Sequence, residues 1–153
     1  YSALALAYCL NPEKIVIIAP KNSINRVWED SIKNVIKNTP KYYISDNHHH
    51  LHSDCFIEVH HYERVSTLKD RLSEYRNKKV VVILDESHNF NELTSDRTIQ
   101  FADFCLSIDC KNTILLSGTP IKAMAREAIP LFRVIDPLFT MDVENAFKKF
   151  SSL

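Results

Sequence analysis

The chain has 153 residues, of which 45% are hydrophobic and 25% are charged, and its formal net charge at pH 7 is zero. This length and composition are typical of one soluble globular domain. The neutral balance excludes a general basic field, so any contact with nucleic acid has to come from local patches. No apolar run approaches the roughly 18 residues of a membrane span, and no signal peptide is visible. We therefore expect an intracellular protein (cytoplasmic, nuclear or viral) with no membrane partner.

The expected elements alternate along the chain. Short aliphatic runs predict strands in residues 15–19, 41–44, 55–59, 80–84 and 113–116. Apolar residues at helical spacing predict helices in residues 1–10, 24–36, 65–75, 99–106 and 143–150. Asp142 is the expected N-cap of the last helix. Strands that alternate with helices predict an α/β fold, a parallel sheet with helices on both faces, in a single domain.

Two adjacent carboxylates, Asp85 and Glu86, follow the apolar strand predicted at residues 80–84. Ligands of such folds bind at the carboxyl ends of the strands, and charges at the end of a buried strand are costly unless they have a partner. Mg²⁺ bound to nucleotide phosphates supplies one, since the first acid can hold the ion and the second can polarise the attacking water. The alternative is a strand end with two solvated acids.

A second strand end favours the nucleotide interpretation. The strand predicted at residues 113–116 is followed by Ser117, Gly118 and Thr119, which include the only glycine of the chain. The two hydroxyl side chains can hydrogen-bond toward the acid pair and His88, so that the neighbouring loop could sense a bound nucleotide. A turn selected for its backbone geometry is the alternative.

These two segments resemble known motifs. Asp-Glu-Ser-His at residues 85–88 and Leu-Ser-Gly-Thr-Pro-Ile at residues 116–121 are similar to motifs II and III of the superfamily 2 helicases and translocases, the second to the Swi/Snf-type branch in particular. Residues 17–23 with 27–29 resemble motif Ia of that branch, and residues 58–63 resemble motif Ib. The resemblance extends over nearly the whole chain and implies a RecA-like P-loop NTPase domain that uses ATP and Mg²⁺.

The resemblance implies a role for each matching residue. Asp85 would organise Mg²⁺, and Glu86 would orient or deprotonate the hydrolytic water. His88 would couple the nucleotide site to residues 117–119. The residues that would lie along a nucleic-acid track are Pro20, Lys21, Asn22, Ser23, His61 and Tyr62. Backbone amides, hydroxyls and one lysine suit phosphate contacts that do not depend on base sequence.

The chain departs from the family in one respect. A glycine-rich phosphate loop ending in Gly-Lys-Thr is expected before the first helix, but residues 1–7 resemble the helix that follows that loop. We therefore expect residues 1–153 to be a fragment of the first RecA-like domain that starts just after the phosphate loop. It is expected to be inactive alone and to act with that loop and a second RecA-like domain of the same protein.

The resulting hypothesis is part of an ATP-dependent helicase or translocase motor of the Swi/Snf-like type, which is an ATPase in the full-length protein. Nucleic acid is the expected partner, and DNA is favoured over RNA because residues 117–121 resemble the branch that moves along duplexes. One alternative is a non-catalytic helicase-like module that binds nucleic acid or a protein partner. Another is a different P-loop ATPase whose acid strand only resembles motif II.

Other features suit ordinary structural roles. Trp28 fits the apolar stripe of its helix, so we expect a core residue rather than a base-stacking platform. The histidines at residues 48–50 and 52 are interpreted as a polar loop, with a zinc site as the alternative. The four cysteines contain no CxxC pair, and we expect reduced thiols.

Overall fold

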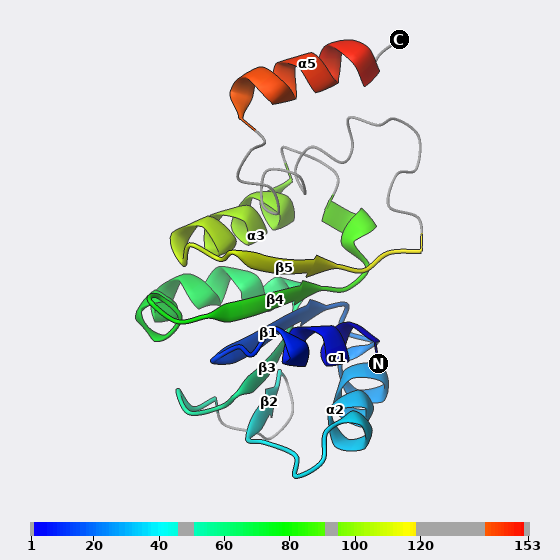
Figure 1. The fold of residues 1–153 in the computed structure, drawn as a ribbon, viewed down its shortest axis with the longest axis vertical. Helices are drawn as coiled ribbons and strands as arrows, with labels where there is room; N and C mark the ends of the chain where they lie inside the picture. Colours follow the sequence, from blue (N-terminus) through cyan, green and yellow to red (C-terminus); the bar gives the residue numbers. More distant parts are fainter. Residues whose placement is uncertain (1, 46–50, 91–94, 119–139, 152–153) are drawn as a thin grey trace.

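The computed structural model describes residues 2–45, 51–90, 95–118 and 140–151. Its centre is a five-stranded sheet in the order β2-β3-β1-β4-β5, and every neighbouring pair is parallel (Figure 1). The strands are β1 (Lys14–Ala19), β2 (Tyr42–Ile44), β3 (Ile57–His61), β4 (Val80–Leu84) and β5 (Asn112–Leu115). Each strand that was expected from the sequence is therefore present, and the predicted parallel sheet is confirmed.

Three helical segments cover one face of the sheet. They are α1 (Ser2–Cys9), a π-helical turn η1 (Ile24–Glu29) and α2 (Asp30–Val35), which continues directly from η1. Ile15 and Ile17 point from β1 into this layer, where they meet Leu4, Trp28 and Ile32. All five of these side chains are buried, as expected for a parallel sheet that is covered by helices.

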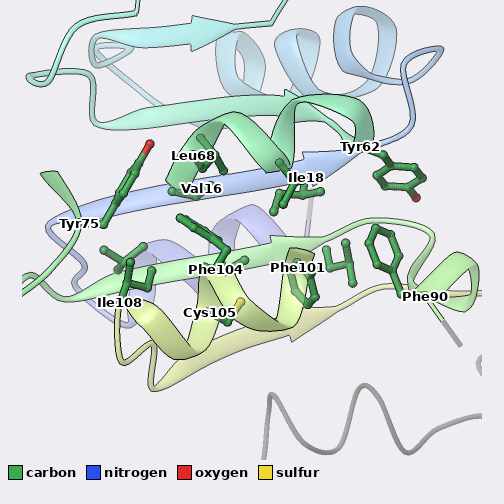
Figure 2. Packing of buried hydrophobic residues seen from close by; sticks show 14 residues of the cluster. Val16, Ile18, Tyr62, Leu68, Tyr75, Phe90, Phe101, Phe104, Cys105 and Ile108 are labelled. Carbon is green, nitrogen blue, oxygen red and sulfur yellow. The ribbon is translucent and has the colours of Figure 1, made fainter. Parts of the chain in front are cut away.

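The opposite face carries the 3₁₀-helical segments η2 (Tyr62–Glu74) and η3 (Ser87–Phe90) and the α-helix α3 (Asp96–Ser107). Val16 and Ile18, which alternate with the residues above, point into this layer. Figure 2 shows the packed cluster, with Tyr75 at one end and with Tyr62 and Phe90 at the end where the strands finish. The α/β architecture with helices on both faces is thus confirmed.

Helix boundaries and faces differ from the sequence prediction in several places. The helix expected over residues 24–36 ends at Val35, because Ile36 already has an extended backbone (φ −106°, ψ 115°). In α3 the expected stripe is only partly correct, since Cys105 is buried and Ala102 packs against the core, whereas Ile99 and Leu106 are exposed. Phe101 and Phe104 fill the core instead, because the large rings bury more apolar surface than the aliphatic alternatives.

The N-cap predicted for the last helix, α5 (Met141–Ser151), is wrong. Asp142 lies inside its first turn, and the residue before the helix is Thr140. The backbone N–H of Val143 donates to Thr140 Oγ1 at 3.4 Å, so the threonine hydroxyl takes the place expected for the aspartate. No helix in the described parts of the chain is long and apolar enough to cross a membrane. All four cysteines are free.

A buried network of charged groups links β1, β3 and η2. The Glu58 carboxylate is fully buried and lies 2.7 Å from Lys14 Nζ. It also accepts hydrogen bonds from Tyr75 Oη at 2.7 Å and Arg71 Nη1 at 3.0 Å, and His60 Nε2 lies 3.0 Å away. Burial alone would raise the pKa of Glu58, but hydrogen bonds from His60, Lys14 and Tyr75 outweigh burial and lower the pKa to about 2. The carboxylate is therefore charged and structural at neutral pH.

Candidate functional site

The carboxyl ends of four neighbouring strands bring distant segments of the sequence together. Ala19 lies opposite His61 across the β1–β3 pair, and Ile18 lies opposite Leu84 across the β1–β4 pair. The segments that follow these strands therefore start at the same edge of the sheet, where ligands of parallel α/β folds bind. Residues 20–23, 62–64, 85–88 and 116–118 begin at this edge.

Asp85 is fixed through its backbone and its carboxylate. Its N–H donates to the carbonyl of Ile18 at 2.8 Å, and its own carbonyl accepts from Tyr62 Oη at 2.6 Å. Carboxylate oxygen Oδ1 accepts from the N–H of Glu86 at 2.9 Å, and Oδ2 accepts from Trp28 Nε1 at 3.0 Å. The first acid is thus held in one orientation by β1, η2 and η1 together.

Glu86 has an unusual backbone. Its φ is +52°, in the left-handed region, whereas the other non-glycine residues with positive φ in the described parts of the chain are all Asn or Asp. Those two types tolerate this region because their short side chains can hydrogen-bond locally. A glutamate there costs on the order of 1–3 kcal/mol, and such strain concentrates at functional sites. The Glu86 side chain is half-exposed, and its direction follows from a backbone conformation that the surrounding loop stabilises.

His88 connects the acid loop to the end of β5. Its Nδ1 lies 2.8 Å from Ser117 Oγ and 3.3 Å from Glu86 Oε2. Backbone pairing makes this approach possible, because the N–H of Ser87 donates to the carbonyl of Leu116 at 2.8 Å. The structure therefore places His88, which was predicted to couple the nucleotide site to residues 117–119, next to Ser117 and also next to Glu86. The coupling role itself stays a prediction.

Gly118 has no positive φ, and no heavy atom of the described residues lies within 4 Å of the position that a Cβ would occupy. Among the described residues, nothing requires glycine at this position. Thr119, the remaining residue of the predicted coupling segment, lies outside the described residues.

The predicted nucleic-acid residues fall into two groups. Lys21 and Asn22 are exposed on a turn that is closed by Ser23, whose N–H and Oγ both donate to the carbonyl of Pro20. His61 and Tyr62, in contrast, are buried. Their role in nucleic-acid binding stays a prediction, while the exposed turn offers the more accessible surface.

Tyr62 makes a structural contact with the acid loop that the sequence did not reveal. Burial, together with the charges of Asp85 and Glu86, raises the pKa of Tyr62 to about 12. Its hydroxyl therefore remains a hydrogen-bond donor to the acid loop at neutral pH. The guanidinium of Arg97 lies over the Tyr62 ring at 4.8 Å from its centre, so α3 also contacts this edge. No sequence motif marked Arg97, because the contact depends on how α3 packs.

Trp28 is buried, as the sequence predicted, and only 4% of it is exposed. Its hydrogen bond to Asp85 was not predicted, because an apolar stripe indicates which face is buried and not what the indole N–H meets. The only advance signal was the residue type, since a buried indole N–H needs an acceptor.

Other candidate sites lie away from the acid loop. His48, His49 and His50 are outside the described residues, and His52 is exposed. Within the described residues no group of three or more His, Cys, Asp or Glu side chains could hold a metal ion. A cavity of about 360 Å³ lies at the amino ends of β4 and β5, and another of about 400 Å³ lies between η2 and α3. Neither cavity is lined by Asp85 or Glu86.

Comparison with known protein families decides the assignment. The profile of the SNF2-related domain matches residues 7–152, which is nearly the whole chain. The chain belongs to the SNF2-related family. Comparison with individual curated proteins gives no match. SNF2-related domains are helicase-like ATPase motors of the Swi/Snf-like branch of superfamily 2, and the parallel sheet described above is consistent with their RecA-like fold. Members of the family generally depend on ATP and Mg²⁺, act on nucleic acid and contain a second RecA-like domain.

Proposed function

We propose that this chain is the Mg²⁺-binding and water-activating part of an ATP-dependent DNA translocase motor. The observation that carries the proposal is the acid loop, in which Glu86 is held with a positive φ between Asp85 and His88. Family membership supports an ATPase in general. The contacts of the loop support the specific roles that we propose for these three side chains.

The donor set suits a hard divalent cation. The Asp85 carboxylate supplies oxygen atoms, which Mg²⁺ prefers as ligands, and its two oxygens are already oriented by the Glu86 N–H and the Trp28 indole. When bound, Mg²⁺ would neutralise the negative charge that develops on the phosphates of ATP. Asp85 would hold the ion because its carboxylate is oriented in advance, and Glu86 would accept a proton from the attacking water or orient it.

The remaining parts of the cycle follow from the contacts of the loop. His88 bridges Glu86 and Ser117, so a change at the nucleotide would reach the end of β5 through this pair. The exposed turn at residues 20–23 would contact phosphates of the nucleic acid, with Lys21 as its charged group. The single glycine of the chain cannot form a glycine-rich phosphate loop. We propose that this loop and a second RecA-like domain complete the motor.

The substitution Glu86→Gln tests the proposal in a protein that contains this chain, a phosphate loop and the second domain. We expect ATP hydrolysis stimulated by duplex DNA to fall at least about 100-fold, because a positioned base contributes about 10²- to 10⁴-fold. Steady-state hydrolysis and equilibrium ATP binding are the measurements, and ATP binding is expected to persist. RNA of the same sequence should stimulate less than DNA.

Asp109→Asn is the control, and its hydrolysis rate should equal that of the wild type. Asp109 is an exposed acid that pairs with Lys111 at the amino ends of β4 and β5, away from the acid loop. Equal hydrolysis rates in wild type and Glu86→Gln would refute the role of Glu86. ATP or DNA binding without any hydrolysis in the wild type would instead support the non-catalytic helicase-like module.

A further inference from the structure

The hydrogen bond between Trp28 and Asp85 joins two segments that are 57 residues apart in the sequence. The indole Nε1 donates to Asp85 Oδ2 at 3.0 Å, and the ring is almost completely buried. The proposed catalytic roles make no use of Trp28. A purely structural tryptophan would need only an acceptor for its N–H, whereas this one uses the carboxylate that is proposed to hold Mg²⁺.

A rare backbone feature places the indole there. Trp28 lies in η1, where the carbonyl of Ser23 accepts from the N–H of Val27 at 3.1 Å and from the N–H of Trp28 at 3.2 Å. The second bond spans five residues, which is the π-helical pattern, and such turns are found frequently at functional sites. Each residue of a regular helix turns the side chain by about 100°, so the wider turn changes the direction of Trp28. The direction that results is the one that meets Asp85.

Apart from Trp28, the contacts of Asp85 hold mainly its backbone, so the orientation of its carboxylate depends on Trp28. Ile18 and Tyr62 bind the backbone of Asp85, and the remaining bond to Oδ1 comes from the adjacent N–H of Glu86. Among the described residues, Trp28 is the side chain that hydrogen-bonds to this carboxylate. Without the indole N–H, the carboxylate would keep a local bond to its own loop but lose its connection to η1.

We propose that Trp28 is a positioning residue for Asp85, holding the carboxylate in the orientation that binds Mg²⁺. This inference rests on the proposed function, because it takes Asp85 as the residue that holds the ion. The connection also ties the exposed turn at residues 20–23 to the acid loop, since Ser23 ends that turn and its carbonyl anchors Trp28. Groups that orient a metal ligand in this way contribute about 10- to 100-fold to metal affinity.

The first test uses the single tryptophan of the chain, which gives one indole N–H signal in an NMR spectrum. In the wild-type chain this proton should exchange slowly with solvent, and its resonance should shift on titration with MgCl₂. In Asp85→Ala we expect exchange at least about 10-fold faster and no shift with MgCl₂. An indole signal with the same exchange rate in both proteins would overturn the proposed contact. An unchanged wild-type resonance at saturating Mg²⁺ would overturn its link to the metal.

The second test separates Mg²⁺ binding from chemistry in the complete motor. Trp28→Phe keeps an aromatic ring in the core but removes the N–H donor. We expect the Mg²⁺ concentration at half-maximal ATP hydrolysis to rise about 10-fold or more, with little change in the rate at saturating Mg²⁺. The matched control is Tyr42→Phe, which removes a hydroxyl that donates to Glu29 Oε1 at 3.1 Å, away from Asp85. The control should leave the Mg²⁺ dependence unchanged.

The outcomes distinguish this inference from the proposed function. Glu86→Gln should lower the maximal rate without changing the Mg²⁺ dependence, which is the opposite pattern. An unchanged Mg²⁺ dependence in folded Trp28→Phe would overturn the positioning role while leaving the ATPase intact. If Trp28→Phe does not fold, the NMR comparison of wild type with Asp85→Ala decides whether Trp28 and Asp85 are in contact. Absence of any hydrolysis in the wild-type motor would count against the proposed function, and the comparison of indole exchange rates would still test the contact.

Discussion

Two glutamates show how differently one residue type is used in this molecule. Glu86 is half-exposed on a backbone with positive φ, where its carboxylate can meet a ligand. Glu58 is fully buried, and its carboxylate forms ion pairs and hydrogen bonds with Lys14, Arg71 and Tyr75. The sequence resemblance includes both residues, but the contacts show that they differ in purpose. Glu58 stabilises the sheet, and Glu86 is exposed at the proposed site.

The buried carboxylate predicts a specific loss of stability in acid. The pKa of Glu58 is lowered from 4.5 to about 2 in the folded chain. A lowered pKa stabilises the fold above the pKa of the unfolded state, and this contribution is lost as the pH falls from about 4.5 toward 2. In Glu58→Gln the free energy of unfolding should therefore depend less on pH over this interval. It should also be lower at pH 7 by about 3–5 kcal/mol, because Lys14 and Arg71 lose their buried partner.

Urea unfolding at several pH values measures this effect. Asp54→Asn is the control, since Asp54 forms an exposed ion pair with Lys41 at 2.6 Å and exposed pairs contribute little. The same acid dependence in Glu58→Gln and wild type would show that other groups control acid unfolding.

At the scale of elements, the ends and faces of helices were less predictable than their existence. The sequence predicts a helix after β4, and α3 is present, but its capping residue was not identified. Ser95 provides the cap, because its Oγ accepts from the N–H of Thr98 at 3.3 Å. Cys105 and Ala102 of the predicted α3 stripe face the core, but Ile99 and Leu106 do not, because aliphatic and aromatic residues compete for the same face in this sequence. The packing of Phe101 and Phe104 against η2 and the sheet decides that competition.

The cap gives a prediction for α3. We expect Ser95→Ala to lower the free energy of unfolding by about 1 kcal/mol, because the first turn loses the oxygen that satisfies one of its N–H groups. Ser107→Ala, at the exposed other end of the same helix, should change it by less than about 0.5 kcal/mol. Thermal or urea unfolding monitored by circular dichroism compares the two. A larger loss in Ser107→Ala than in Ser95→Ala would contradict the assigned cap.

At the scale of the whole molecule, one sheet separates two apolar layers. Alternate residues of β1 enter opposite layers, with Ile17 on the side of α1 and α2 and Ile18 on the side of η2 and α3. Because the same strands belong to both layers, a substitution that destabilises one layer should also destabilise the other. The described part of the chain should therefore unfold as one cooperative unit.

Leu68→Ala tests this cooperativity. Leu68 is 1% exposed in η2, so its truncation should lower the free energy of unfolding by about 2–5 kcal/mol. Trp28 lies in the opposite layer and is the only tryptophan, so its fluorescence reports on the face that is not mutated. We expect the fluorescence and circular dichroism transitions of Leu68→Ala to coincide at the same lowered midpoint. A fluorescence transition that stays at the wild-type midpoint would show that the layers unfold separately.

The sequence by itself determined three features: the order of the strands and helices along the chain, the parallel sheet, and the position of the acid pair at a strand end. These features depend on local patterns, namely apolar runs, apolar residues at helical spacing and short sequence motifs. Each of these patterns is contained in a short stretch of the chain. Membership of the SNF2-related family was also visible in residues 85–88 and 116–121.

Only the tertiary structure decided how the acid pair is held. The positive φ of Glu86, the approach of His88 to Ser117 and the bond from Trp28 to Asp85 each depend on contacts between separate strands or helices. A hydrogen bond across 57 residues leaves no periodic trace in the sequence, because it is fixed by the packing of the elements that carry its two ends. The sequence therefore located the acids, and the packing around them determined their geometry.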